Sequence, residues 1–197
     1  SGKRERTAGQ LVQLLADLGP MPEAEEADDR AFWAAALINP LPALGVDFDV
    51  VKGKGPVIPE PVRTAAQVAR LTPLEDPTRT HAFVGETLGN LRREVGGEAT
   101  GLGFVGPPWT LAAYAMEGGA QRHCRATKEI MTQEPAVLHA LLAHLAAQLV
   151  TYVSYQVQSG AQVVQLFDSW AHHLTPAQLR EFSLPYVQRV VAGVRAL

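Results

Sequence analysis

The chain has 197 residues, of which 47% are hydrophobic and 19% charged, and its formal net charge is −3. This composition is typical of an ordinary globular domain with a sizeable core, and it excludes a disordered or fibrous chain. It also lacks the basic excess that binding to a nucleic-acid backbone requires.

Cysteine content and apolar runs bear on where the chain works. Its one cysteine, Cys124, can form no disulfide within the chain. It favours a reducing compartment, such as the cytoplasm, the plastid stroma or the mitochondrial matrix. The apolar run from Leu138 to Val150 is interrupted by His139, His144 and Gln148. It is also shorter than the roughly 20 residues that span a bilayer, so we expect no membrane span.

Residues 1–30 predict a helix followed by an acidic linker. Leucines recur at helical spacing over residues 6–18, and Gly19-Pro20 ends the pattern. The acidic run Glu23 to Asp29 is typical of a solvated linker. The first part of the chain therefore predicts one short helix, followed by this linker or by the first turn of a second helix.

The segment after this linker predicts one strand and then mostly loop. The apolar stretch from Phe32 to Ile38 predicts a buried strand. Residues 40–61 are dense in Pro and Gly, with a strand-like alternation only over residues 46–51.

From Thr80 onward strands and helices alternate, which is typical of a parallel sheet with crossover helices. We expect helices over residues 81–95, 127–131 and 135–159, a helix that begins at Pro176 after the capping residue Thr175, and strands over 102–105 and 163–167. The two strands should be adjacent and parallel, and the helices between them should connect them.

Several short stretches, in one consistent order, resemble the uroporphyrinogen decarboxylase family. They are Pro40 to Gly45, Lys52 to Pro56, Pro59 to Arg63, Gly103 to Leu111, Tyr114 to Gly119, Gln165 to Ala171 and Leu184 to Tyr186. Any one of them is a weak signal, but together they are a strong one. The resemblance covers about residues 37 to 197.

The resemblance implies an α/β fold, a single-domain (β/α)8 TIM-type barrel of a kind that commonly dimerises. Such a barrel takes about 250 residues. This chain offers three convincing barrel strands, near Phe32 to Ile38, at 102–105 and at 163–167. We therefore expect residues 31–197 to form the N-terminal part of a partial (β/α)8 barrel. Another polypeptide, or more of this one, should cover the sheet that the missing strands leave open.

The resemblance also implies a chemistry. Members of the family convert the acetate arms of uroporphyrinogen to methyl groups without a metal or an organic cofactor. An Asp holds the pyrrole N–H groups, and arginines grip the substrate carboxylates. Here Ala35-Ala36 fall at the family's Ser-Asp pair. The arginine loop is matched by Arg6 to Gln10, so that Arg6 is a candidate catalytic residue and Gln10 replaces the second arginine. The histidine near the family's C-terminus has no match in these residues.

The matched stretches nominate Tyr114, Phe167 and Ser169 as substrate-binding residues. The alternative is that Tyr114 and Phe167 are core aromatics. Two histidine-containing pairs, His123-Cys124 and His172-His173, lack further ligands at zinc-binding spacing, so we expect no metal site.

Three functions fit these observations. The first is a degenerate family member that acts as a structural or assembly subunit, a pseudoenzyme of porphyrin biosynthesis in the chloroplast or elsewhere. The second is a fragment of an active decarboxylase that converts uroporphyrinogen to coproporphyrinogen. The third is a module that binds a tetrapyrrole without turnover. Ala36 favours the first, because a fragment does not explain a substitution at this position unless residues are missing between Trp33 and Leu37.

Overall fold

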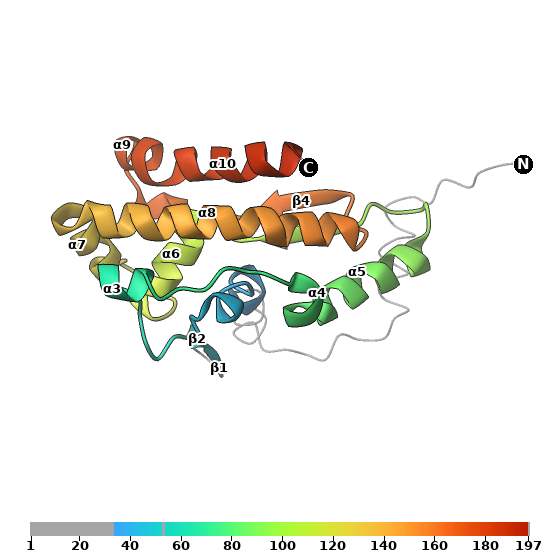
Figure 1. Cartoon of the computed structure of the whole chain (residues 1–197), viewed down its shortest axis with the longest axis horizontal. Helices are drawn as coiled ribbons and strands as arrows, with labels where there is room; N and C mark the ends of the chain where they lie inside the picture. The colour runs from blue at the N-terminus through green and yellow to red at the C-terminus, as the bar shows by residue number, and fades with distance from the viewer. Residues whose placement is uncertain (1–33, 53, 197) are drawn as a thin grey trace, which may run out of the picture.

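The computed structural model describes residues 34–52 and 54–196. The long helix α8 (Pro135–Gln158) runs through the middle of the molecule, and the other elements are arranged around it (Figure 1). Along one side of it lies α10 (Leu184–Arg195). The remaining helices are α3 (Ala65–Val68), α4 (Pro77–Thr80), α5 (Ala82–Val95), α6 (Pro108–Glu117), α7 (Arg125–Gln133) and α9 (Pro176–Gln178). Short 3-10 turns are formed by η1 (Pro42–Leu44) and η2 (Ala171–His173), and η3 (Leu179–Ser183) is a π-helical turn.

The expected parallel strands are present. β3 (Leu102–Val105) and β4 (Val163–Leu166) pair in parallel, with Leu102 opposite Val163 and Val105 opposite Leu166. The helices α6, α7 and α8 lie between them in the chain. This confirms a strand–helix–strand unit of the kind from which parallel sheets are built. Among the described residues, these two strands are the only ones that pair in parallel.

The strand expected near Phe32 to Ile38 is wrong where it can be compared, because Ala34, Ala35, Ala36 and Leu37 are helical. Phe32 and Trp33 lie outside the described residues. Alanine is the strongest helix former, and a run of three favours a helical turn over a strand. The segment still lies at the end of β3, since Gly106 N donates to Leu37 O at 2.9 Å. An α/β fold is therefore observed, but a barrel is not.

The Pro/Gly-dense segment contains a small hairpin. β1 (Asp49–Val51) falls within the predicted alternation, and it pairs antiparallel with β2 (Gly55–Val57). The rest of the segment is mostly loop, as expected, but β2 was not anticipated because Pro56 interrupts any alternation of apolar and polar residues. Val57 also forms a bridge to Gly119 after α6, so contacts distant in sequence help to fix this strand.

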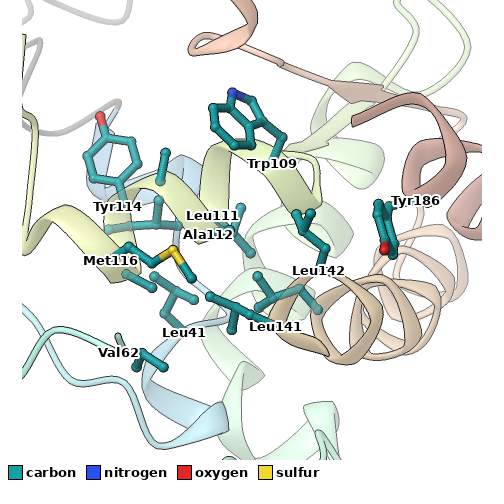
Figure 2. Close-up of a cluster of buried hydrophobic side chains, with 14 of the residues drawn as sticks. Leu41, Val62, Trp109, Leu111, Ala112, Tyr114, Met116, Leu141, Leu142 and Tyr186 are labelled. Atoms are coloured by element: carbon teal, nitrogen blue, oxygen red, sulfur yellow. The ribbon is translucent and has the colours of Figure 1, made fainter. Parts of the chain in front are cut away.

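The hydrophobic core lies between α6 and α8. Nine of the ten residues of α6 are buried, and the buried face of α8 packs against them. Figure 2 shows Trp109, Leu111 and Met116 of α6 beside Leu141 and Leu142 of α8.

The apolar run within α8 was expected to be too short to span a bilayer. The helix as a whole is nevertheless long and apolar enough to cross a membrane, judged by length and composition. Half of its most apolar window is buried in the protein, as in a core helix.

Polar residues on α8 fix the chain that precedes α5. His144 Nε2, Gln148 Oε1 and Tyr155 Oη hydrogen bond the backbone of residues 72–81 at 3.1, 2.9 and 3.1 Å. Because these side chains recur along one side of α8, the histidine and glutamine that interrupt its apolar run serve as attachment points. They hold the irregular residues 72–76 and the end of α4 against the core helix.

Candidate functional site

Asp168 braces the loop that follows β4. Its carboxylate accepts hydrogen bonds from Thr110 Oγ1 of α6, at 2.8 Å, and from Ser183 Oγ of η3, at 2.9 Å. Burial raises the pKa of Asp168, and these two hydrogen bonds oppose that rise because they favour the ionised form. The carboxylate therefore connects the end of β4 to the elements before and after it in the chain.

Trp170 carries this loop into the core. The indole of Trp109 donates from Nε1 to Trp170 O at 3.1 Å, and Trp170 N donates to Thr110 Oγ1 at 3.4 Å. The Trp170 ring is buried and meets the ring of Tyr114 edge-on, with the ring centroids 5.2 Å apart. The loop after β4 is thus held against α6 through both backbone and ring contacts.

Tyr114 lies within this cluster. Its ring is only 5% exposed, and burial raises the pKa of its phenol. In Figure 2 its hydroxyl points away from the labelled leucines and methionine. A tyrosine in this setting keeps its proton at neutral pH, so it can present a hydroxyl but not an anion to a bound molecule.

Phe167 and Ser169 are exposed on the same loop. Phe167 is 42% exposed, and its ring meets the ring of Phe104 on β3 edge-on at 6.1 Å. The structure thus brings Ser169 and Phe167 to the end of β4, and Trp170 connects that end to Tyr114. Arg6 and Gln10 lie outside the described residues. Ala36 is half-buried in the helical turn beside the end of β3.

One face of the two-stranded sheet is covered and the other is open. On the covered side, Gln156 of α8 accepts from Phe104 N at 2.9 Å and donates to Phe104 O at 3.1 Å. On the other side, Leu102 and Val163 are each about half exposed and Phe167 slightly less. Leu102 and Val163 are register partners and Phe167 follows at alternate spacing, so all three face the same way. We call these three residues the open sheet face.

Three residues of this site were not identified as such from sequence, namely Thr110, Trp170 and Ser183. Thr110 and Trp170 lie inside stretches that resemble the family. Thr110 could have been identified because it is a polar residue in the otherwise apolar first turn of a helix that is buried. Ser183 gave no signal, because its contact with Asp168 depends on how η3 folds back.

Cys124 does not present the thiolate that binds metal ions. Cys124 is buried with a left-handed backbone, and burial raises its pKa to about 12, so it is a thiol rather than a thiolate. The structure groups no three His, Cys, Asp or Glu residues of the described chain in a way that could hold a metal ion.

We expect Thr110→Val to destabilise the protein by about 1 to 3 kcal/mol at neutral pH, because it removes a donor from a largely buried carboxylate. Asp168 has a folded pKa above its unfolded value, so its ionisation costs stability as pH rises through that window. The variant raises this pKa further. Its penalty should therefore shrink as pH falls toward about 4, where the carboxyl is increasingly protonated. Urea unfolding at both pH values measures this.

The matched control is Thr132→Val on α7, whose hydroxyl donates to Lys128 O on the exposed surface. It should change the free energy of unfolding by less than about 0.5 kcal/mol at either pH. Equal penalties for the two variants would contradict the bracing role of Asp168.

Comparisons with known proteins point to one family. The profile of the family described as Uroporphyrinogen decarboxylase (URO-D) matches residues 15–197. The chain is 51% identical over 193 residues to the uroporphyrinogen decarboxylase of Prochlorococcus marinus strain MIT 9313, covering 98% of this chain and 54% of that protein. It is 43% identical over 194 residues to that of a Synechocystis strain, covering 98% and 55%. The chain thus spans about half the length of the curated relatives it matches.

A solved structure supports the same fold. A methyltransferase from Methanosarcina mazei superposes with a TM-score of 0.55 at 17% sequence identity, covering 81% of this chain and 46% of that one. At this identity the likeness concerns the fold alone. The family follows from the sequence match, which extends over most of the chain and includes helix α6, which holds Tyr114, and the loop that holds Trp170: the chain belongs to the uroporphyrinogen decarboxylase family.

Proposed function

We propose that this chain is a non-catalytic, structural or assembly subunit built on the first half of a uroporphyrinogen-decarboxylase fold. The observation that carries the proposal is the open sheet face, which includes the candidate substrate-binding residue Phe167 and lies close in the chain to Ser169. Parallel sheets are normally covered on both faces, and an uncovered apolar face favours association. The occupant is a polypeptide that supplies further barrel strands, either as a separate chain or as more of this one.

The catalytic part of the proposal rests on the residues that the family chemistry needs. Ala36 stands where the resemblance expects the Asp that stabilises developing positive charge, and Gln10 stands where it expects the second arginine. Without the buried carboxylate, protonation of a pyrrole carbon loses its electrostatic stabilisation.

A second candidate is a fragment of an active decarboxylase. It is favoured by the length comparison, since the relatives are nearly twice as long as the part that this chain matches. In that case the remaining half would complete both the sheet and the catalytic groups.

Complementation separates the two candidates. The chain is co-expressed with the C-terminal half of the Prochlorococcus relative, and the two are tested for co-purification and for anaerobic conversion of uroporphyrinogen. The subunit proposal predicts a stable complex without turnover, whereas the fragment proposal predicts a complex with turnover. A monodisperse monomer of ordinary stability that binds nothing would contradict both.

A surface variant locates the contact. Val163→Glu places a charge on the open sheet face and should abolish co-purification, because burying an unpaired carboxylate is costly. Phe83→Glu is the matched control, since Phe83 of α5 is 55% exposed and lies outside this face. It should leave co-purification unchanged.

A further inference from the structure

Two adjacent histidines lie beside the candidate substrate loop. His172 and His173 belong to η2, which follows Ser169 and Trp170, and their ring centroids are 4.0 Å apart. The ring of His173 stacks on Trp170 at 5.1 Å. Because Trp170 is itself held by Trp109 and packed on Tyr114, the pair is attached to a fixed platform at the end of β4.

The backbone fixes which nitrogen of His172 is available. Its Nδ1 lies 3.0 Å from Ser169 O, and a carbonyl oxygen can only accept, so Nδ1 carries a proton. In the neutral ring Nε2 is then an acceptor, which does not bind a carboxylate. Protonation turns Nε2 into a donor and gives the ring a positive charge. The exposed imidazole of His172 is therefore a proton-dependent donor next to Ser169.

The groups near His173 are two further histidines, one lysine and one glutamate. Burial lowers the pKa of His173, and the nearby His172, Lys128 and His123 lower it further, whereas Glu117 raises it. Glu117 is already engaged, since its Oε1 accepts from both Thr127 N and Thr127 Oγ1 at 2.7 Å. When His172 and His173 are protonated, they repel each other and the nearby Lys128. An anion bound between these side chains relieves that repulsion.

We infer that His172 and His173, supported by Lys128 and His123, form a proton-dependent binding site for carboxylate groups at the end of β4. The inference rests on the proposed function and deepens it. A polycarboxylate tetrapyrrole needs cationic partners for its carboxylates, and the family arginine loop is only partly matched in this chain. The histidine pair supplies positive charge at the same loop that carries Ser169 and Phe167.

The probe is benzene-1,3,5-tricarboxylate, titrated into the protein in a chelator-containing buffer at about pH 6 and about pH 8. Binding is followed through the imidazole carbon-bound proton signals of the histidines by NMR. We expect binding at least about tenfold tighter at the lower pH, the scale of one charge-assisted hydrogen bond, and we expect the signals of His172 and His173 to shift. Equal affinity at the two pH values would overturn the inference.

Variants show whether this pair is responsible. The double variant His172→Gln, His173→Gln should remove the pH dependence of binding. Lys128→Gln should weaken binding at both pH values and leave the pH dependence unchanged. The control is His139→Gln on α8, a histidine whose Nδ1 lies 2.7 Å from Tyr186 Oη. It should leave binding unchanged. If the double variant retains tenfold pH dependence while folding normally, the site lies elsewhere.

A negative result in this binding experiment would not contradict the proposed function, and failure of the proposed function would not contradict the histidine site. The tricarboxylate needs no barrel and no turnover, so the histidine site can be present in a chain that never binds a partner. Conversely, a complex that assembles through the open sheet face, but shows no tricarboxylate binding in either form, would leave the subunit proposal intact and remove the histidine site.

Discussion

Purified protein of this sequence is expected to show no measurable conversion of uroporphyrinogen to coproporphyrinogen. A buried carboxylate that stabilises a developing cation contributes about 3 to 4 kcal/mol, if an oxyanion-hole donor indicates the scale, and its loss costs on the order of 10²- to 10³-fold in rate. Ala36 supplies no such group, and Gln10 cannot grip a carboxylate as an arginine does. The described sheet also lacks the strands that would enclose a substrate.

The measurement is anaerobic product analysis by chromatography, beside an active family member. Ala36→Asp alone should restore nothing, because Gln10 still stands where the resemblance expects the second arginine and the described sheet gains no strands. Turnover within about tenfold of the active control, a barrier difference of only about 1.4 kcal/mol, would contradict the non-catalytic reading. It would also show that Ala36 does not stand at the position of the family Asp.

The parallel unit of the fold was predictable because its signals are local. The strand at 102–105 is a short apolar run between Gly101 and Gly106, and the strand at 163–167 begins shortly after Gly160 and ends at Asp168. The long helix between them has an apolar face that continues for many turns. Thr175 also forms the capping box expected at a helix start, with Gln178 as its partner. The spacing of apolar residues, together with the residues that begin or end helices and strands, was sufficient to predict these elements.

The elements that were missed depend on contacts distant in sequence. The apolar composition of Ala34 to Leu37 suited a strand as well as a helix, and local helix propensity prevailed. The strand β2 contains Pro56 and lacks alternation, and it is fixed by pairing with β1 and by the bridge to Gly119. Neither interaction can be inferred from a short window of sequence.

The resemblance nominated residues for the candidate site, but it could not show how they are connected. Tyr114, Phe167 and Ser169 came from stretches that resemble the family, and the structure places Phe167 and Ser169 on one loop that Trp170 joins to Tyr114. Sequence could not show that Thr110 and Ser183 both donate to Asp168, because the three residues come from separate elements. The resemblance to the family nominates individual residues, whereas hydrogen bonds between separate elements can be identified only from the three-dimensional structure.

Trp109→Ala should be the most destabilising single substitution among those considered. Trp109 is fully buried in α6, and its Nε1 donates to Trp170 O at 3.1 Å. Truncation leaves a cavity and an unpaired carbonyl, at a cost of about 3 to 5 kcal/mol in the free energy of unfolding. Since domains of this size are stable by only about 5 to 15 kcal/mol, the variant should be partly unfolded in mild denaturant.

Two further variants separate the contributions in the same urea titrations. Trp109→Phe keeps most of the ring volume and loses the donor, so it should cost less, about 1 to 3 kcal/mol. Leu91→Ala on α5 is the surface control, because Leu91 is half exposed, and it should change stability by less than about 0.5 kcal/mol. If Trp109→Ala cost no more than Leu91→Ala, α6 would not be packed against α8 and Trp170 as described. The loop that carries Ser169, His172 and His173 would then have no fixed platform, so the binding site inferred for carboxylates depends on this result as well.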